Sequence, residues 1–516
     1  MTVPDFGSGV ELAALPEGRM IAGCVDGTAV IVANDRGRYR AVSATCTHMG
    51  APLQEGLLVN GEVRCPWHHA RFSLSTGEAV GAPAFAPLRR FVTVVRDGRV
   101  FLSEFRPSGL GAELGAASPS VGHATAVRVV IVGGGASGFA CAEWLTRRGF
   151  AGVTLICDEP DPPYDRTVCS KQYLIGMKSR QDCFIAGAPA GTGAGGAGAN
   201  GMNLRLGCKV DAIDPDRKTV RLAADERLPF DVLVLATGGE PVRPKLPGLD
   251  LANVYQLRTL SDADALIGAA RKAKRVAVIG ASFIGLEVAA SLRQRSLEVA
   301  VVSPEEVPLQ KQLGAEIGAM IQTVHEEKGV RFHLGRQVRQ FDGRRLALDD
   351  GSSIEADFVV LGTGIKPRTE LARAAGLAVA PVEDGGGVIV NERLESSVPG
   401  IFAIGDIAQY PDPHTGRRIR VEHWVHAQRQ GQHVARVIMG QANGFADPPF
   451  FWSAHFDTGL RYLGHVDTLG ASTTEGSLEA RSFSRCQHGT GSEKAYITCN
   501  RDLDSLRAEA DWDQAI

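Results

Sequence analysis

Two stretches of this chain place a glycine-rich turn between an apolar strand and a helix. In the first, the apolar run Val127 to Val132 is followed by GGGASG at residues 133–138 and a helical pattern. In the second, Arg275 to Ile279 is followed by GASFIG at residues 280–285. Glycines in such a turn permit a tight bend and a close backbone approach to a pyrophosphate at the helix N-terminus. The two turns therefore predict two α/β units with parallel sheets, each binding a dinucleotide.

The first turn supplies the predicted nucleotide contacts Gly133, Gly135 and Gly138. The strand after its helix, Val153 to Ile156, is followed closely by Asp158 and Glu159. An acid at this position accepts hydrogen bonds from ribose hydroxyls. We favour Asp158 over Glu159 for this role.

The second turn supplies the predicted contacts Gly280, Ser282 and Gly285. Ser282 stands at the middle glycine position, where it leaves a side chain facing the phosphates. The following strand, Glu298 to Val302, ends at Ser303. An acid there would favour NADH and nearby arginines would favour NADPH. Neither marker is present, so the choice stays open, with a slight preference for NADH because no arginine cluster follows.

The strongest local motif in the chain pairs cysteine with histidine twice. Cys46-Thr47-His48 is separated by 16 residues from Cys65-Pro66-Trp67-His68. Two thiolates on one iron and two imidazoles on the other are the ligands of a Rieske [2Fe–2S] cluster, whereas zinc accepts the same four side chains tetrahedrally. Gly50, Pro66 and the later Gly77 match the Rieske pattern, so we favour that cluster over zinc.

The two loops resemble the Rieske ferredoxin family and depart from its high-potential branch. That branch has an additional cysteine in each loop and hydroxyls that hydrogen-bond to the cluster sulfurs. The corresponding positions here are Ala51, Trp67, Ala70 and Phe72. Without hydroxyl donors the reduced cluster is less stabilised, and we expect a low potential of about −150 mV. His69 adjoins a ligand but fits neither pair, and we interpret it as a loop residue near the cluster.

Further segments resemble the two-dinucleotide flavoprotein family, and nearly the whole chain is covered. Residues 231–238 (DVLVLATG) resemble the linker motif between its FAD and NAD domains, and residues 401–406 (IFAIGD) resemble its second flavin motif. Other segments resemble the ferredoxin-reductase and apoptosis-inducing-factor branch, namely residues 163–166 (PYDR), 170–171 (SK), 257–259 (LRT), 421–424 (VEHW) and 450–452 (FFW). The Rieske module upstream resembles the apoptosis-inducing-factor-like subgroup that carries one.

This resemblance implies roles for individual residues. Arg166, Lys171 and Arg258 would contact FAD, and Lys171 would pair with Glu287 beside the flavin ring, where a cation stabilises the anionic reduced flavin. A surface ion pair is the less favoured interpretation. The remaining implied contacts are Thr237 and Gly238 of the linker motif, Asp406 on the ribityl chain, and Glu422, His423, Trp424 and Trp452 near the ring. Glu422, His423 and His426 also suggest an iron triad of the oxygenase kind, which we rate low.

The pattern predicts a multidomain protein with an all-β Rieske domain, an α/β flavoprotein fold and a small α+β C-terminal domain. The expected boundaries are a Rieske domain at 1–105, a linker at 106–126, an FAD domain at 127–248 and 381–445, an NAD(P)H domain at 249–380 and a C-terminal domain at 446–516. Within the FAD domain, residues 186–201 (AGAPAGTGAGGAGANG) form a low-complexity loop to which we assign no function.

Composition narrows the class of protein. With a formal charge of −3, 44% hydrophobic and 22% charged residues, nothing favours binding to nucleic acid or anionic lipid. The N-terminus lacks the pattern of a signal peptide and no segment is apolar enough to span a bilayer, so we expect a cytoplasmic protein, as a monomer or homodimer. In such a reducing compartment the ten cysteines would be thiols or metal ligands.

The resulting functional hypothesis is hydride transfer from NADH or NADPH to FAD, then single-electron steps to the Rieske cluster and a partner protein. An oxygenase or another metalloenzyme is the expected acceptor. One alternative is an autonomous NAD(P)H oxidase or peroxidase using Cys169, and the other is a redox-sensing signalling module. Disulfide reduction is improbable because the chain has no C-x2-C or C-x4-C pair. For Cys169, a buried apolar role is the favoured interpretation.

Overall fold

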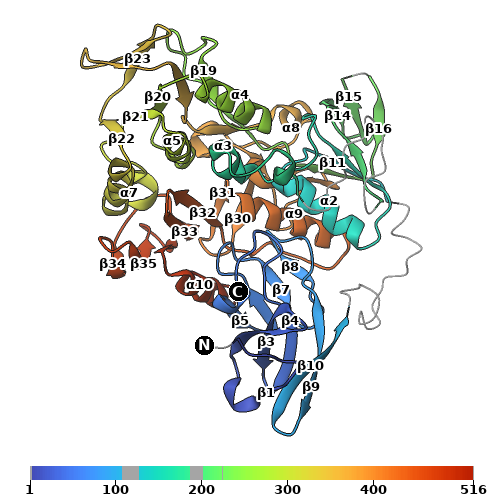
Figure 1. Ribbon diagram of the computed structural model, residues 1–516. Coiled ribbons are helices and arrows are strands. Elements are labelled where there is room, and N and C mark those ends of the chain that lie inside the picture. Colours follow the sequence, from blue (N-terminus) through green and yellow to red (C-terminus); the bar gives the residue numbers. More distant parts are fainter. Residues whose placement is uncertain (1–2, 107–126, 186–200, 224, 515–516) are drawn as a thin grey trace. The chain divides into compact units, whose positions relative to one another are not determined.

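The computed structural model describes residues 3–106, 127–185, 201–223 and 225–514 (Figure 1). It divides into two compact units: Met1–Ala126 with Arg501–Ile516, and Val127–Asn500. The predicted linker, apart from Arg106, and the low-complexity loop, apart from Gly201, lie outside the described residues. Residues 501–514, which the sequence places in the C-terminal domain, pack with the first unit instead. The finer division within Val127–Asn500 stays a prediction.

The first unit is built on two antiparallel sheets. A six-stranded sheet has the order β1-β10-β9-β4-β3-β2, and a four-stranded sheet has the order β5-β6-β7-β8. The strands of the first are β1 (Val10–Glu11), β2 (Met20–Val25), β3 (Thr28–Asp35), β4 (Arg38–Ser43), β9 (Arg90–Arg96) and β10 (Arg99–Arg106). Those of the second are β5 (Leu57–Val59), β6 (Glu62–Arg64), β7 (Arg71–Ser73) and β8 (Ala79–Gly81).

Alternation along β3 explains how this unit is packed. Successive side chains of a strand point to opposite faces. Val30 and Val32 belong to one buried cluster, whereas Ile31 and Ala33 belong to another that also contains residues of both cysteine loops. The strand is therefore apolar on both faces, and one face forms the floor beneath the loops that carry the cysteine–histidine pairs.

One helix of the first unit comes from the far end of the chain. Helix α10 (Asp502–Gln514) packs beside β5 (Figure 1). Its buried residues include Leu506, Glu509 and Trp512. A buried glutamate on this helix requires a polar partner in the β module, which is described below.

Two parallel sheets in the second unit confirm the predicted α/β fold. The first has the order β13-β12-β11-β17-β29 and the second the order β19-β26-β20-β21-β22. The strands of the first are β11 (Val129–Val132), β12 (Val153–Ile156), β13 (Asn203–Arg205), β17 (Val232–Leu235) and β29 (Ile401–Ala403). Those of the second are β19 (Val254–Gln256), β20 (Arg275–Ile279), β21 (Glu298–Ser303), β22 (Val330–Leu334) and β26 (Phe358–Leu361).

The helices of this unit follow the strands as the sequence pattern predicts. Helix α2 follows the first glycine turn and packs closely on α9, while α5 follows the second. The helices are α2 (Ala136–Arg147), α3 (Gln172–Ile175), α4 (Leu260–Ala270), α5 (Phe283–Gln294), α6 (Gln310–Leu313), α7 (Ala315–Glu327), α8 (Glu370–Ala374) and α9 (Trp424–Ile438). Among the described residues, none of the helices is long and apolar enough to cross a membrane.

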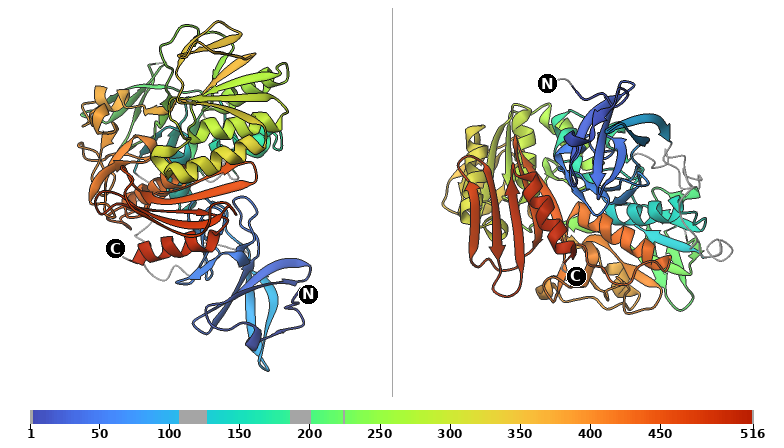
Figure 2. Two further views of the ribbon diagram at one scale, coloured as in Figure 1. Left: turned by 90° about the vertical axis from the view of Figure 1, so that its left-hand side faces the viewer. Right: turned by 90° about the horizontal axis from the view of Figure 1, so that it is seen from below.

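The remaining strands form one C-terminal sheet and four small ones. The C-terminal sheet has the order β32-β33-β36-β35-β34 and is antiparallel (Figure 2). Its strands are β32 (Phe450–His455), β33 (Thr458–His465), β34 (Ser472–Ser477), β35 (Ser482–His488) and β36 (Lys494–Cys499). The small sheets are β14 (Val210–Asp214), β15 (Thr219–Leu222) and β16 (Arg227–Pro229); β18 (Gly239–Pro241) and β27 (Ile365–Pro367); β23 (Val338–Phe341), β24 (Arg345–Leu348) and β25 (Ser353–Glu355); and β28 (Val388–Ile389), β30 (Ala408–Asp412) and β31 (Arg417–Arg420).

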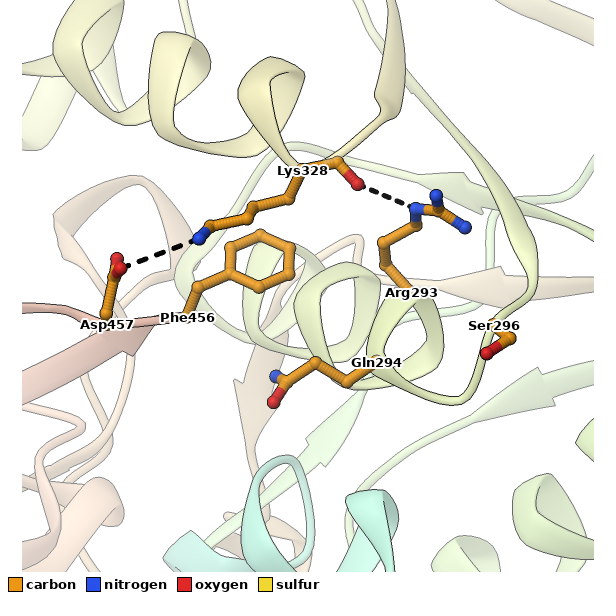
Figure 3. Close-up of a pocket in the computed structure, with 6 residues that line it drawn as sticks. All are labelled: Arg293, Gln294, Ser296, Lys328, Phe456 and Asp457. Carbon is orange, nitrogen blue, oxygen red and sulfur yellow. Dashed lines mark hydrogen bonds and ion pairs between the residues drawn. The ribbon is translucent and has the colours of Figure 1, made fainter.

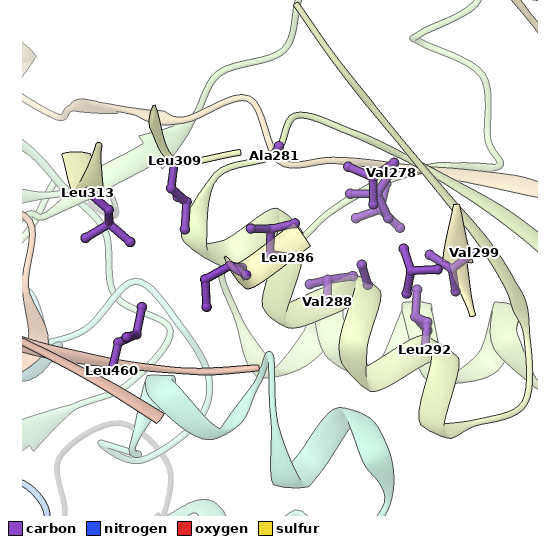
Figure 4. Packing of buried hydrophobic residues seen from close by; sticks show 14 of the residues in the cluster. Val278, Ala281, Leu286, Val288, Leu292, Val299, Leu309, Leu313 and Leu460 are labelled. Carbon is purple, nitrogen blue, oxygen red and sulfur yellow. The ribbon is translucent and has the colours of Figure 1, made fainter. Parts of the chain in front are cut away.

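The C-terminal sheet shares a core with the second parallel sheet. Leu286 and Leu292 of α5 pack against Val278 of β20 and Val299 of β21 (Figure 4). Leu460 of β33 belongs to the same buried cluster. Burying one leucine contributes about 1.5–3 kcal/mol, so this shared cluster fixes β32 and β33 firmly against α5.

Candidate redox centres

The two cysteine–histidine loops are held in tight turns by backbone hydrogen bonds. In the first, Cys46 N–H donates to Ala51 O at 2.9 Å, and Gly50 takes a positive φ of 81°. In the second, Cys65 N–H donates to Ala70 O at 2.8 Å and His69 takes a positive φ of 61°. In each loop, the residue with positive φ follows the ligand histidine, and its N–H donates to the carbonyl of the ligand cysteine. This hydrogen bond closes the turn that carries both ligands.

The four predicted ligands meet in like pairs. The Nδ1 atoms of His48 and His68 face each other at 3.1 Å. The thiols of Cys46 and Cys65 contact each other, and this hydrogen bond with burial raises the pKa of the Cys46 thiol above its usual range. Because a Rieske cluster takes two thiolates on one iron and two imidazoles on the other, this donor set fits the cluster.

The side chains around the loops are apolar, as the departures from the high-potential branch predict. Ala51 is 1% exposed, and Ala70 and Phe72 are 0% exposed. All three belong to the cluster that also contains Cys46 and Cys65. These positions offer no hydroxyl to a cluster sulfur, which keeps the predicted low potential as an expectation.

Helix α10 braces the second loop with buried charges. Glu509, on this helix, accepts from His69 Nδ1 at 3.0 Å and lies 3.5 Å from a guanidinium nitrogen of Arg64. The other terminal nitrogen of Arg64 lies 2.7 Å from Asp513. His69 is therefore more than the neighbouring loop residue predicted: it anchors the loop to a helix about 440 residues away in the sequence.

In the first glycine turn, the structure separates two closed positions from one open one. A Cβ on Gly133 would lie 2.2 Å from Ala236 O, and one on Gly138 would lie 1.9 Å from Gly133 O. A Cβ on Gly135 would meet nothing within 4 Å. The first and last glycines therefore allow the close turn, while the middle one faces open space where a pyrophosphate can approach.

The second turn repeats this geometry but uses Ser282 differently from the prediction. A Cβ on Gly280 would lie 2.3 Å from Gly362 O, and one on Gly285 would lie 2.2 Å from Gly280 O. Ser282 Oγ donates to Gly362 O at 2.8 Å and accepts from Gly285 N–H at 3.2 Å. The hydroxyl therefore caps the first turn of α5, and the contact of Ser282 with the phosphates stays a prediction.

The two candidate ribose acids have different surroundings. Glu159 accepts from Arg166 and from Tyr164 OH, both at 2.6 Å. Burial alone would raise the pKa of Glu159, but these partners outweigh it and lower the pKa. Asp158 is half exposed and lies 3.3 Å from Arg368. Asp158 is thus the acid open to a ligand, and its role stays a prediction.

Five predicted flavin residues lie after β17 and β29 of the first sheet or contact residues there. Arg258 donates to Asp406 at 2.8 Å, and its guanidinium would lie 3.3 Å from a Cβ added to Gly238. Arg166 donates to the carbonyl of Arg258 at 2.5 Å. Thr237 donates to Arg368 O at 2.8 Å. The positive side chains and the open glycine turn fit an anionic dinucleotide.

Lys171 and Glu287 form the predicted ion pair. The Lys171 ammonium lies 2.7 Å from Glu287 Oε2, and their side chains are 13% and 3% exposed. Ser170 Oγ donates to the same oxygen at 2.6 Å, and Ser453 Oγ donates to Glu287 Oε1 at 2.7 Å. This burial contradicts a surface ion pair. Removing either partner would leave an uncompensated charge in the interior.

The residues after β31 serve different purposes. The Arg420 guanidinium donates to the Glu422 carboxylate at 2.5 Å and to the carbonyl of Asp406 at 2.9 Å. His423 packs on Phe451, with ring centroids 4.2 Å apart, and Trp424 begins α9. His426 is fully buried and its Nε2 lies 2.9 Å from Tyr410 OH. With His426 directed to Tyr410 and Glu422 to Arg420, the structure does not favour an iron triad.

Cys169 is buried in an apolar cluster with Val168 and Leu260. It is 2% exposed, and burial raises the pKa of its thiol to about 12. Since the thiolate is the reactive form, this cysteine is a poor nucleophile near neutral pH. The preferred interpretation, an apolar substitute, fits this environment.

Several residues of these centres escaped the sequence analysis. Ser453 and His455 alternate along β32, and this spacing puts both on one face of the strand. That alternation was a usable signal. Glu509 carries none, because its partners Arg64 and His69 lie in a different part of the sequence.

The fold and the two centres define a redox enzyme of flavin, pyridine nucleotide and iron–sulfur chemistry. The family model described as pyridine nucleotide-disulphide oxidoreductase matches residues 127–431, and the one described as Rieske [2Fe-2S] domain matches residues 10–92. This chain belongs to the pyridine nucleotide-disulphide oxidoreductase family and carries a Rieske domain. Its cofactors are FAD, NAD(P)H and a [2Fe–2S] cluster, and the match favours the cluster over zinc.

Individual relatives agree with this assignment. Apoptosis-inducing factor 3 of Homo sapiens is 31% identical over 474 residues, which cover 88% of this chain and 75% of that protein. The anthranilate 1,2-dioxygenase system ferredoxin–NAD(+) reductase component of Burkholderia cepacia is 36% identical over 341 residues, which cover 65% of this chain and 81% of that protein. The chain is an NAD(P)H-dependent FAD oxidoreductase, as predicted.

A solved structure shows the same fold. The covalent putidaredoxin reductase–putidaredoxin complex contains a chain with a TM-score of 0.69 and 30% identity to this one. The similarity covers 75% of this chain and 93% of that chain. The predicted fold class, a β Rieske module followed by a ferredoxin-reductase-type flavoprotein, is confirmed.

Proposed function

We propose that this chain passes electrons from NAD(P)H through FAD to its own Rieske cluster and then to a partner protein. The single observation that carries the proposal is that one chain contains both the buried Lys171–Glu287 pair, where we place the two-electron flavin, and the two cysteine–histidine loops, where we place the one-electron cluster. One NADH gives two electrons and one proton, so two turnovers of a one-electron centre balance one hydride.

The expected partner is an oxygenase or a ferredoxin-type acceptor. The Burkholderia cepacia relative is named as the ferredoxin–NAD(+) reductase component of a dioxygenase system, and the solved relative is held in a complex with putidaredoxin. Both names describe reductases that serve an electron-accepting protein. We extend that role to this chain, with a cytoplasmic location and a monomeric or dimeric state as further expectations.

The chain's own residues orient the cofactors. Cys46, His48, Cys65 and His68 would hold the cluster, while Arg258, Asp406 and the open turn at Gly135 would hold FAD. The flavin supplies hydride acceptance when bound. The Lys171 ammonium, fixed by Glu287, provides positive charge where negative charge develops in the reduced state.

We further propose that NADH is the preferred donor. Ser303, at the end of β21, donates to Glu305 at 2.5 Å, so an acid does stand near the strand end, two residues later than expected. This hydrogen bond lowers the pKa of Glu305 and favours its charged form. A carboxylate here accepts ribose hydroxyls and repels a 2′-phosphate. Glu305→Gln should lower the ratio of kcat/KM with NADH to kcat/KM with NADPH. An unchanged ratio would contradict the proposed preference for NADH.

Stopped-flow spectroscopy tests the electron route. After mixing with NADH, the flavin absorbance should bleach first and the cluster bands should fade afterwards. Cys46→Ser provides the control: without a cluster, flavin bleaching should persist and the second phase should vanish. A cluster that stays oxidised in the unaltered protein while the flavin bleaches removes the relay from the proposal.

A further inference from the structure

A chain of buried hydrogen bonds continues inward from the Lys171–Glu287 pair. Ser453 Oγ lies 2.7 Å from Glu287 Oε1 and 3.2 Å from His455 Nε2. His455 Nδ1 in turn lies 3.2 Å from His325 Nε2. Ser453 is 1% exposed, and both histidines are 0% exposed. The chain thus connects Glu287 on α5 with His325 on α7 through two residues of β32.

The carboxylate at one end fixes the direction of every hydrogen bond. Ser453 donates its only hydroxyl proton to Glu287, so its oxygen must accept from His455 Nε2–H. His455 Nδ1 then carries no proton and accepts from His325 Nε2–H. Both imidazoles are therefore neutral Nε2–H tautomers, and all donors point toward Glu287.

The surroundings of the two imidazoles keep them uncharged. Burial, with the nearby His455, lowers the pKa of His325 to about 2, and burial, with the nearby Lys171, lowers the pKa of His455 to about 3. Glu287 itself faces Lys171, Ser170 and Ser453. Neutral imidazoles with one donor and one acceptor nitrogen can pass a proton through the ring without holding the charge.

The last residue of this hydrogen-bond chain, His325, packs against a residue that lines a pocket. His325 Nδ1 is buried and has no hydrogen-bond partner among the described residues. The ring of Phe456 packs edge-on against His325 at 5.2 Å between centroids, and Phe456 also lines a pocket of about 520 Å³ (Figure 3). Lys328 and Asp457, which also line the pocket, form an ion pair (Figure 3). The half-buried ring of Phe456 thus contacts both this pocket and the His325 ring.

We propose that His325, His455 and Ser453 form a proton relay between this pocket and Glu287. A proton arriving at His325 Nδ1 displaces the Nε2 proton of His325 to His455 Nδ1. The His455 Nε2 proton then moves to Ser453 Oγ, whose own proton moves to Glu287 Oε1. One proton enters, one reaches the carboxylate, and the hydrogen bonds end with reversed polarity, so the return step is the same path backwards.

The relay answers a charge problem that NAD(P)H-dependent electron transfer creates. Each reduction adds negative charge beside Lys171, and each oxidation removes it. In a buried site, such a change is costly unless a proton follows. The relay offers a path along which a proton reaches the buried site when the charge arrives and leaves it when the charge is removed. This inference rests on the proposed place of the flavin beside Lys171, but not on the proposed route through the cluster.

Tautomer measurement tests the relay in the unaltered holoprotein. Nitrogen-15 NMR of the imidazoles should show His325 and His455 as neutral Nε2–H forms at pH 7 and still neutral at pH 5. Either histidine in the Nδ1–H form, or charged at pH 5, would overturn the proposal because the hydrogen bonds would run in another direction.

Proton uptake on reduction tests the path itself. In anaerobic stopped-flow mixing with NADH and no added acceptor, with a pH-indicator dye in weak buffer, we expect Ser453→Ala and His455→Gln to slow proton uptake at least tenfold, with the KM for NADH, measured separately with ferricyanide, unchanged. Ser453→Thr, which keeps the hydroxyl, should restore the rate. His433→Gln replaces a buried histidine of α9 that lies outside the hydrogen-bond chain, and it should take up protons at the rate of the unaltered protein. Equal uptake rates in all variants would exclude the relay, whatever the cluster does.

Discussion

Glu509 and Glu287 are both buried glutamates beside a redox centre, yet they are used in opposite ways. Glu509 is 1% exposed and joins two residues of the second cysteine–histidine loop, Arg64 and His69. Glu287 is 3% exposed, faces Lys171 and continues into Ser453 and a chain of imidazoles. The first carboxylate holds a helix and a loop together, whereas the second begins a chain of hydrogen bonds. Burial of a charge alone therefore does not identify a functional group; what its partners connect to does.

The largest predicted effect concerns the contacts that hold α10 to Arg64 and His69. Deleting residues 502–516 removes Glu509 and Asp513 and leaves Arg64 buried without its partners. Breaking a buried ion pair costs about 3–5 kcal/mol. We expect the iron and sulfide content to fall sharply, while the flavin content serves as the control. Retention of a full cluster by the shortened protein would show that α10 does not hold the loop.

Matched glutamine substitutions compare the two carboxylates directly. Glu509→Gln should lower the free energy of unfolding of the Rieske unit by about 1–3 kcal/mol, the value of a buried hydrogen bond to a charged group, and leave flavin reduction unchanged. Glu287→Gln should slow flavin reduction by NADH about 10²-fold, because the Lys171 ammonium loses its fixed counterion. Denaturant unfolding and stopped-flow reduction separate the two results. The reverse pattern would invert the comparison.

The cysteine–histidine pairs and both glycine turns were predictable because each is a local pattern. The strands Val153–Ile156 and Arg275–Ile279 are mainly apolar, and their observed bounds equal the predicted ones. The geometry of the turns follows from the glycines alone. Local spacing is thus enough to mark Cys46, His48, Cys65 and His68 as a candidate ligand set, whereas their meeting in like pairs depends on how the two loops pack.

The parts that escaped prediction are those made by tertiary packing. Helix α10 joins the first unit through contacts between Glu509 and residues about 440 positions earlier, which no periodicity encodes. The N-cap hydrogen bonds of Ser282 also escaped the sequence analysis, because its partner Gly362 lies 80 residues away in the sequence. Likewise, Glu287 was expected from the family resemblance, but its link to His325 needs the packing of α7 on β32.

The imidazole chain also predicts how stability depends on pH. His325 and His455 have pKa values of about 2 and 3 in the folded protein against an ordinary value of 6.5, chiefly because both are buried. The unfolded chain therefore binds more protons than the folded one below about pH 6.5, and stability falls as the pH falls through this window. His455→Gln removes one such group. As the pH falls from 6 to 4, the free energy of unfolding of this variant should decrease by about 1.4 kcal/mol less per pH unit than that of the unaltered protein, as measured by urea unfolding. Equal slopes would mean that His455 is charged in the folded state.

The smallest predicted effect falls on Cys169, which lies two residues from Lys171. Proximity would suggest chemistry, but the thiol is 2% exposed and its pKa of about 12 keeps it protonated. Cys169→Ser should therefore change NADH oxidation with ferricyanide by less than about twofold, and peroxide should not raise the rate of the unaltered protein. The matched control is Cys183→Ser in the same apolar cluster, which tests the packing cost of a buried hydroxyl without touching the ion pair. If Cys169→Ser alone abolished turnover, the oxidase or peroxidase hypothesis would replace the electron route, because a thiol with no access to solvent can matter only by reacting at the flavin.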